Sequence, residues 1–451
     1  MSTSNQLGEE KISKLLLSFS IPAIVAMVVN AIYNIVDRVF IGRVVGSDAF
    51  AGAFVVFPII LILMAIGSLS GFGGAALTSI RLGQKREEEA KFILGNAFII
   101  LVISGIVFTA VLLIFPEPIL KFFGAKDKVL PHSKEYLRYL AFGFPFQMLG
   151  FGLNNFVRAI GKPKLAMTSM LSGAIVNIIL DALFIYFMGL GIKGAAIATA
   201  IAQIIAFLIV FIFFISEKNT EMRLEIAYMT PQFCIIKKIL ALGMTQFSIQ
   251  LLNSIITLIY NRVLSETGGA IAISTYGIIN SILTIIILPV FGINQGSQPI
   301  VGYNYGAKNY KRVKDTLKLA IGVATIFTSI GFILTQFFTK SIVGLFTKNP
   351  ELLKTADHGV KLFFLSFIIV GFQIVSSNYF QAKGLPMKSF IMSISRQGLI
   401  LVPALLILSR KYGLNGIWYA APLSDVLAAI LTGIFLFFDL KDMNRKMLEE
   451  K

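Results

Sequence analysis

Apolar residues run along this chain in long blocks, separated by short polar joints. Blocks of about 20 or more mostly apolar residues recur from end to end, and a helix of that length crosses a hydrocarbon core about 30 Å thick. The pattern therefore predicts an all-α membrane protein. Its twelve spans are expected near residues 15–41, 50–79, 92–115, 137–158, 165–188, 192–215, 239–264, 272–300, 315–338, 358–381, 388–409 and 414–438.

The two halves of the chain repeat each other at an offset of 223 residues. Matching positions include Asn30 and Asn253, Gly73 and Gly296, Gly83-x-Lys85 and Gly306-x-Lys308, and Phe123 and Phe346. Six spans per half is an even number, so both halves enter the bilayer in the same sense. We expect two pseudo-symmetric six-helix lobes at residues 1–215 and 239–438, a linker at 216–238 and a tail at 439–451. Transporters of this build hold their substrate at the interface between the repeats.

Composition and charge narrow the class of protein. Hydrophobic residues make up 56% of the chain and charged residues 14%, which is not the composition of a soluble globular protein. The net charge of +17 comes from Lys and Arg in short joints, which indicates membrane topology and not a nucleic-acid partner. With the amino terminus inside, the inner segments carry 25 Lys/Arg and the outer ones 15. The bias predicts a multi-pass plasma or inner membrane protein with both termini in the cytoplasm.

Ionisable residues inside spans cost about 2.5–3.5 kcal/mol on insertion scales and are candidates for function. Asp37 ends a polar stripe on the first helix that also contains Asn30, Tyr33 and Asn34. Asn177 and Asp181 lie four residues apart on the fifth helix and share a face, while Thr199 lies on the sixth. Helix geometry places these groups roughly 8–16 Å below the outer surface. Carboxylate, amide and hydroxyl oxygens at similar depth suit a hard cation such as Na⁺, or a shared proton.

Other readings of these residues stay open. Asp37 also fits the aqueous end of its helix, paired with Arg38 or Arg43. Pro22 permits a kink in the same helix, which is either static or a hinge that links ion occupancy to bending.

Arg396 and Asp425 are expected at similar depth on the eleventh and twelfth helices, and a structural ion pair is the favoured interpretation of them. The repeat equivalent of Asp425 is Gln203, which suggests a polar position that lines the interface.

Several patterns that resemble catalytic motifs do not fit their usual context. Gly189-x-Gly191-x-x-Gly194 lies between two apolar spans, where a tight hairpin is expected instead of a dinucleotide site. The chain has no GxxxxGK[ST] motif, and neither His132 nor His358 has the partner of a zinc protease. The lone Cys234 excludes a disulfide framework. We therefore expect neither an enzyme nor a cofactor.

The chain resembles a multidrug and toxic compound extrusion (MATE) transporter over essentially its full length. The motifs that carry the resemblance are Pro22…Asn30-x-x-Tyr33-x-x-x-Asp37, Asn154-Asn155-x-x-Arg158-Ala159-x-Gly161-x-Pro163, Asn177-x-x-x-Asp181 and Gly296-x-Gln298-Pro299-Ile300-x-Gly302-Tyr303-Asn304-Tyr305-Gly306. The resemblance implies two lobes in a V around a central cleft. It also implies export of amphipathic or cationic drugs, driven by sodium or protons.

The resemblance further implies roles for residues. Asp37, Asn177, Asp181 and Thr199 look like the first-lobe cation site of the DinF-like prokaryotic branch, with Tyr33 and Asn154 around it. The branch that uses a glutamate on the seventh helix is matched poorly, since Gln246, Gln250 and Asn253 occupy that polar face. The protein is expected to act as a monomer in the bilayer. The rival hypothesis is a lipid-linked oligosaccharide flippase, which would line its cleft with several Arg or Lys residues.

Overall fold

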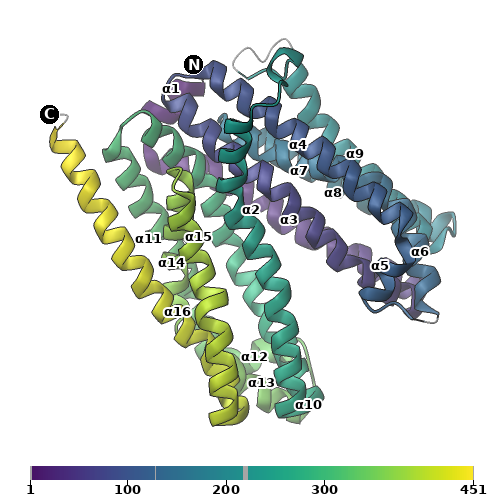
Figure 1. The fold of residues 1–451 in the computed structure, drawn as a ribbon. Helices are drawn as coiled ribbons and strands as arrows, with labels where there is room; N and C mark the ends of the chain where they lie inside the picture. The colour runs from purple at the N-terminus through teal and green to yellow at the C-terminus, as the bar shows by residue number, and fades with distance from the viewer. Residues whose placement is uncertain (1–2, 127, 217–221, 450–451) are drawn as a thin grey trace. The chain divides into compact units, whose positions relative to one another are not determined.

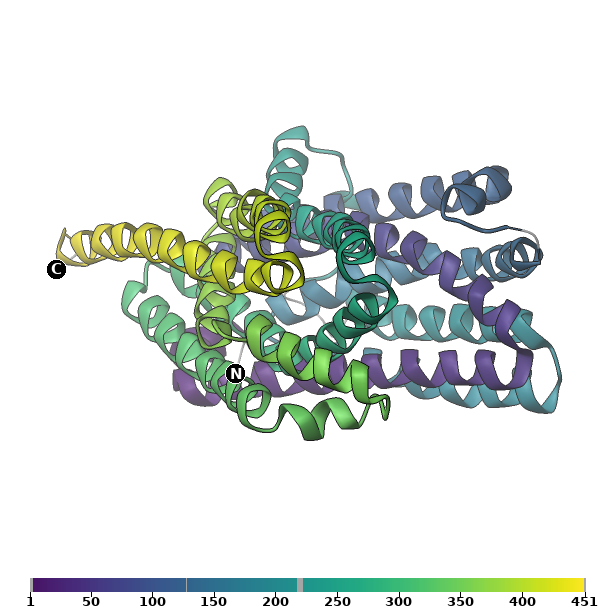
Figure 2. The same cartoon turned by 90° about the horizontal axis from the view of Figure 1, so that it is seen from below.

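The computed structural model describes residues 3–126, 128–216 and 222–449, and all regular secondary structure in these ranges is helical (Figures 1 and 2). In chain order the elements are α1 (Thr3–Glu9), α2 (Ile12–Phe40), η1 (Ile41–Val45), α3 (Ser47–Gly83), α4 (Glu87–Ile114), α5 (Pro116–Phe122), α6 (Val129–Leu140), η2 (Ala141–Gly143), α7 (Phe144–Ala159), α8 (Pro163–Asp181), η3 (Ala182–Phe187), α9 (Gly191–Ile215), η4 (Ile226–Tyr228), α10 (Phe233–Gly306), α11 (Tyr310–Phe337), α12 (Thr339–Gly344), α13 (Pro350–Phe363), α14 (Phe367–Ala382), α15 (Pro386–Ile394), η5 (Ser395–Leu401) and α16 (Val402–Glu449).

Among the described residues, eight helical segments are long and apolar enough to cross a membrane, and the bent pair α13–α14 makes a ninth. Two of the eight are double. Gly269 interrupts α10 and Gly413 interrupts α16, each with a positive φ that a side chain would strain. The sixteen-residue α7 is shorter than the others. Each of the twelve predicted spans thus corresponds to one helical pass, and the predicted all-helical, multi-span membrane fold is confirmed.

Two predicted spans are not continuous helices. The span expected at 137–158 is divided into α6, the 3₁₀ turn η2 and α7. The span expected at 358–381 bends by 51° between α13 and α14. The last predicted span, 414–438, lies in α16. This helix continues to Glu449, through the residues expected to form the tail.

The chain divides into two compact units, each with its own apolar core. The first unit contains the residues before Glu10 together with Ile21–Phe247, and the second contains Glu10–Ser20 together with the chain from Ser248 onward. The first turns of α2 therefore belong to the second unit, and the first turns of α10 to the first. The predicted linker lies within the first unit, and its residues 217–221 fall outside the described ranges.

Two glycines at matching repeat positions allow this exchange. A Cβ on Gly73 of α3 would collide with the carbonyl of Ile239 in α10. A Cβ on Gly296 of α10 would collide with the hydroxyl and the backbone N of Ser20 in α2. Helix backbones can approach this closely only where one of them has no side chain.

The repeat is also visible in the backbone. Lys85 and Lys308 are the non-glycine residues with positive φ in the described ranges, at 58° and 59°, and they occupy equivalent places in the two halves. Both follow the long second helix of their half. The duplication therefore preserved both the residue type and the local backbone geometry at this position.

Part of the linker is fixed to the first unit. The Asn96 side chain of α4 donates to the carbonyl of Thr230 at 3.1 Å and accepts from the Gln232 backbone N–H at 2.8 Å. The Tyr228 ring packs edge-on against Phe92 at 5.0 Å. This segment is thus held against α4 and is not a free connection.

Candidate functional site

Two of the predicted site residues meet where α8 and α9 pack together in the first unit. Asn177 and Asp181 lie one helical turn apart at the end of α8, and both are buried. The Asn177 Nδ2 atom donates a hydrogen bond to Thr199 Oγ1 of α9 at 3.2 Å. The four-residue spacing read from the sequence therefore does place the amide and the carboxylate on one face, opposite Thr199.

Asp181 is the most isolated acid of this site. Its side chain is fully buried, and among the described residues no hydrogen-bond donor reaches either carboxylate oxygen. Asn177 Oδ1, one turn away, is also buried without a donor. A buried carboxylate that lacks both donors and a counter-charge is strongly disfavoured. The arrangement therefore favours uptake of a cation or a proton at Asp181.

The second acid, Asp37, comes from the last turn of α2 and lies beside Asp181. The two carboxyl groups lie within electrostatic range of each other. Two carboxyls at that separation repel each other unless a proton or a metal cation lies between them. Because hard oxygen ligands suit Na⁺ as well as a proton, the donor set fits either ion.

Each acid is followed by a π-helical segment. Segment η1 begins four residues after Asp37, and η3 begins immediately after Asp181. The two segments contact each other. Single π-helical turns inside α-helices occur often at functional sites, because the wider turn reorients side chains and frees backbone groups.

A small cavity of about 50 Å³ adjoins Asp37 on another side. Its lining includes the polar side chains of Asn34, Asp37 and Tyr136 and the rings of Phe50 and Phe57. One water molecule needs roughly 10–15 Å³ of such volume, so several waters fit. The cavity therefore has room for water next to Asp37.

The remaining members of the polar stripe lead along α2 toward this pair. Asn34 Nδ2 donates to the Asn30 carbonyl at 2.7 Å and to Asn30 Oδ1 at 3.1 Å. The Tyr33 side chain lies within electrostatic range of both Asp37 and Asp181. Pro22 is buried, eight residues before Asn30, and lies two residues after Ser20, the last residue of α2 that belongs to the second unit.

Two other predicted residues, Asn154 and Gln203, pack against neighbouring helices, and Asn154 lies far from the acid pair. Asn154 donates to the carbonyl of Ala166 at 2.9 Å, which lies fifteen residues before Asp181, or about 22 Å along α8. Gln203 packs its side-chain carbonyl oxygen against Gly143 of η2. Both residues therefore lie in helix–helix contacts of the first unit. Sequence spacing gave no means of seeing this, because it does not say which neighbouring helix a polar side chain meets.

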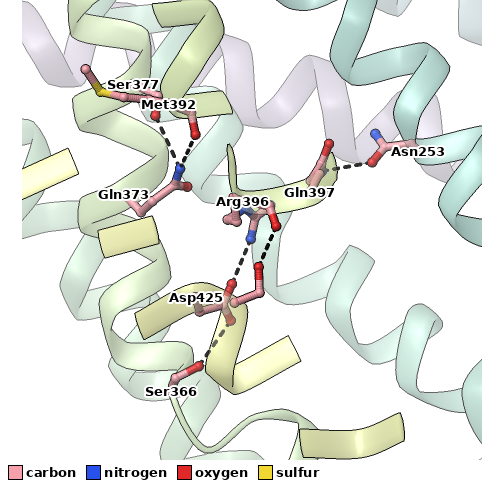
Figure 3. Close-up of polar contacts among 9 residues, drawn as sticks. Asn253, Ser366, Gln373, Ser377, Met392, Arg396, Gln397 and Asp425 are labelled. Atoms are coloured by element: carbon pink, nitrogen blue, oxygen red, sulfur yellow. Dashed lines mark hydrogen bonds and ion pairs between the residues drawn. The ribbon is translucent and has the colours of Figure 1, made fainter. Parts of the chain in front are cut away.

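The polar face predicted on α10 is shared between the units. Gln246 falls in the first unit, whereas Gln250 and Asn253 fall in the second. The exposed Asn253 accepts a hydrogen bond from Gln397 Nε2 at 2.9 Å (Figure 3). No glutamate occupies this face.

In the second unit, Arg396 and Asp425 form the predicted ion pair (Figure 3). Arg396 Nη1 lies 3.2 Å from Asp425 Oδ1, and Ser366 donates to the other carboxylate oxygen at 3.1 Å. Arg396 comes from the π-helical segment η5, and the adjacent Ser424 hydroxyl donates to the Arg396 carbonyl. The predicted proximity is correct; the purely structural role is still a prediction.

The sequence interpretation missed a second buried ion pair. Lys383 Nζ lies 2.6 Å from Asp439 Oδ2, and the Tyr379 hydroxyl donates to the same oxygen at 2.8 Å. Asp439 falls in the segment 439–451 that the sequence predicts as a tail. The sequence contains one indication of this burial, because Asp439 directly follows Phe437 and Phe438. If the apolar helix continues beyond residue 438, Asp439 is part of that helix and can be buried.

The sequence analysis names Arg158 only as part of a motif and assigns no role to it, although it is buried. Arg158, near the end of α7, donates to Asn155 Oδ1 at 3.0 Å and approaches Met170 Sδ at 3.6 Å. Within the described residues it has no carboxylate partner.

Comparison with known proteins agrees with the duplicated fold. The MatE family model matches residues 22–183 and 247–406, and the ends of the two matches are separated by the repeat offset of 223 residues. Together the matches cover most of the chain.

Known relatives match nearly the full length. The multidrug export protein MepA of Staphylococcus haemolyticus (strain JCSC1435) is 30% identical over 434 residues, which cover 96% of this chain and 95% of that protein. MepA of Staphylococcus aureus (strain NCTC 8325 / PS 47) is 30% identical over 428 residues, covering 94% and 93%.

Solved structures share the fold. A MATE transporter crystallised in complex with MaL6 has a TM-score of 0.92 at 24% identity, covering 99% of this chain and all of that one. An outward-facing multidrug resistance MATE transporter of the MOP superfamily has a TM-score of 0.90 at 24% identity, with 97% and 98% covered. The chain belongs to the MATE family of multi-pass membrane transporters.

Proposed function

We propose that this protein is a secondary antiporter that exports amphipathic, often cationic, organic compounds in exchange for Na⁺ or H⁺. Its relatives are named multidrug export proteins. The observation that carries the coupling proposal is the fully buried Asp181 carboxylate, which lacks a donor in the described residues and lies beside Asp37. A transporter needs a group whose affinity for the driving ion differs between conformations, and this pair has the chemistry for it.

Residues around the pair have distinct roles in this proposal. Asp37 takes the ion from the hydrated cavity, and Asp181 shares it within the apolar interior. Asn177 and Thr199 offer amide and hydroxyl oxygens at the same place. The π-helical segments η1 and η3 supply wider turns that adjust when the charge between the acids changes. Tyr33 and Asn34 line the approach on α2.

Pro22 is proposed as the hinge of α2. The turns before it pack in the second unit and the turns after it carry Asp37 in the first. Proline removes one intrahelical hydrogen bond and tolerates bending. A change of charge at Asp37 would therefore alter the bend of α2 at Pro22.

Further features of the proposal follow from sequence. We propose cytoplasmic termini from the distribution of Lys and Arg, a monomer as the active form, and a DinF-like first-lobe cation site. The absence of a glutamate at Gln246, Gln250 and Asn253 supports the last point.

The test is ethidium transport by purified protein in liposomes, under a sodium gradient alone and then under a pH gradient alone. We expect Asp37→Asn and Asp181→Asn each to reduce gradient-driven transport by about 100-fold or more, because the amide cannot carry the charge on which coupling depends. Asp48→Asn is the matched control, since Asp48 is exposed in the first turn of α3. Normal ion-driven transport by the Asp181→Asn protein would refute the coupling site.

A further inference from the structure

Among the ion pairs described in the second unit, two have largely buried partners and differ in how completely they are shielded. The pair of Lys383 and Asp439 is short, at 2.6 Å, and its side chains are 3% and 5% exposed. Tyr379 donates to the same carboxylate oxygen, and the Lys383 ammonium also lies 5.1 Å from the Tyr379 ring centre. This pair is sealed and well satisfied, as expected of a group that only holds helices together.

The pair of Arg396 and Asp425 is looser. It measures 3.2 Å, and its side chains are 23% and 12% exposed. Arg396 makes one side-chain hydrogen bond among the described residues, through Nη1, although a guanidinium carries five N–H donors. Asp425 accepts from Arg396 and Ser366, whereas a carboxylate has about four acceptor sites. Both partners therefore retain capacity for another group.

The surroundings of this pair contain further unused polar atoms. The Tyr260 hydroxyl is buried without a partner in the described structure and lies within electrostatic range of Asp425. Its ring stacks on Tyr276 at 4.4 Å. The Gln397 Oε1 atom is likewise buried without a donor. Buried polar groups in proteins are normally satisfied, so these atoms indicate a ligand with hydrogen-bonding capacity.

The backbone at this place is also unusual. Arg396 and Gln397 lie in η5, a π-helical segment like those that follow Asp37 and Asp181 in the first unit. Gln397 reaches the exposed Asn253, so the polar groups extend from the ion pair to the surface of the unit (Figure 3).

We infer that Asp425 is the carboxylate that binds the cationic group of the exported compound, and that Arg396 occupies it as an internal competitor when no compound is bound. The inference rests on the proposed export function and adds the position of substrate recognition. An amphipathic organic cation displaces the Arg396 guanidinium from Asp425. The freed guanidinium, already part-exposed on a long flexible chain, moves away from the carboxylate. When the compound leaves, Arg396 pairs with Asp425 again.

Competition of this kind makes opposite predictions for the two partners. Ethidium binding to the purified full-length protein in detergent is measured by fluorescence anisotropy, without any ion gradient. Asp425→Asn should weaken binding by at least about tenfold, the value of one charge-assisted contact. Arg396→Gln should strengthen binding, because the internal competitor is gone. Asp439→Asn is the matched control and should leave the affinity of the folded protein unchanged.

A purely structural ion pair predicts a different result. Both Asp425→Asn and Arg396→Gln would then weaken binding together, or neither would change it, and either outcome overturns the inference. Thermal unfolding of each variant checks that it is folded. A second readout uses the unaltered protein: saturating ethidium should accelerate phenylglyoxal modification of Arg396, measured by mass spectrometry. An unchanged or slower rate also overturns the inference.

The test is separable from that of the proposed function. Failure of the unaltered protein to bind or transport ethidium would refute both. Loss of the Asp425 effect with normal ion-driven transport would refute the inference alone. Normal transport by Asp181→Asn would refute only the coupling site.

Discussion

Asp181 in the first unit and Asp439 in the second are both buried carboxylates, yet their surroundings are opposite. Asp439 accepts from Lys383 at 2.6 Å and from Tyr379 at 2.8 Å. Asp181 has no donor among the described residues, and its neighbour Asp37 is another acid. The first arrangement stabilises a fold. The second costs free energy, and proteins retain such costs mainly where a function depends on them.

The contrast is informative because both units come from one repeated sequence. Backbone geometry survived duplication, as Lys85 and Lys308 demonstrate with nearly identical positive φ values. Charge did not survive: the positions that match Asp37 and Asp181 are Tyr260 and Pro403. Duplication thus conserved the scaffold and left each unit free to acquire its own polar chemistry.

The largest effect is expected in the sealed pair. Asp439→Asn leaves the Lys383 ammonium buried without its counter-charge and should destabilise the protein by about 3–5 kcal/mol. Thermal or denaturant unfolding in detergent measures this. The double variant Lys383→Met/Asp439→Leu is the control, since removing both charges should recover most of the loss. A single variant as stable as the parent would mean that the two acids do not differ as described.

The opposite sign is expected at Asp181. Asp181→Asn removes a buried charge that lacks donors, and the neutral amide should raise stability by about 1–3 kcal/mol. The same unfolding assay measures the change, with Asp48→Asn as the exposed control. Stability that rises while transport falls would identify Asp181 as a functional group that the fold tolerates at a cost. A clear loss of stability would instead mean that Asp181, like Asp439, stabilises the fold.

The smallest effect is expected where charges face water. Glu117 pairs with Lys121 at 2.8 Å and with Lys134 at 3.4 Å, and all three side chains are well exposed. Hydrogen bonding from Lys121, with its positive charge, lowers the pKa of Glu117. A lowered pKa stabilises the fold above the usual glutamate range, and this contribution disappears as pH falls through the folded-state pKa.

Glu117→Gln should therefore leave the melting temperature unchanged within error at neutral pH, because water and salt screen such pairs. The same comparison at about pH 4, where the unfolded glutamate is partly protonated, should show an even smaller difference. A large shift at either pH would mean that charge alone, and not burial, explains the contrast between Asp181 and Asp439.

Much of the arrangement could be predicted from sequence. Periodicity placed Asn177 and Asp181 on one face, and depth along the helices grouped Thr199 and Asp37 with them. In the structure, Asn177 donates to Thr199, and Asp37 lies within electrostatic range of Asp181. The apolar blocks predicted every helical pass, because length and hydropathy are properties of the chain alone.

What remained hidden depends on partners that are distant in sequence. Lys383 and Asp439 are separated by 56 residues, and no local pattern connects them. The sequence does not distinguish Asn154 from the polar residues of the cation site. In the structure, however, its hydrogen-bond partner on α8, Ala166, lies far from Asp181. Periodicity identifies the face of a helix on which a residue lies, but the neighbour across that face is set by tertiary packing.

The close helix crossings at Gly73 and Gly296 have a consequence for how the gene can be divided. Each unit borrows the opening turns of a helix whose remainder belongs to the other. If the two halves were expressed as separate polypeptides, each half would need the first helical turns of the other to pack against its own glycine, Gly73 or Gly296. In this respect the protein resembles an arm-exchanged dimer whose subunits have been fused into one reading frame.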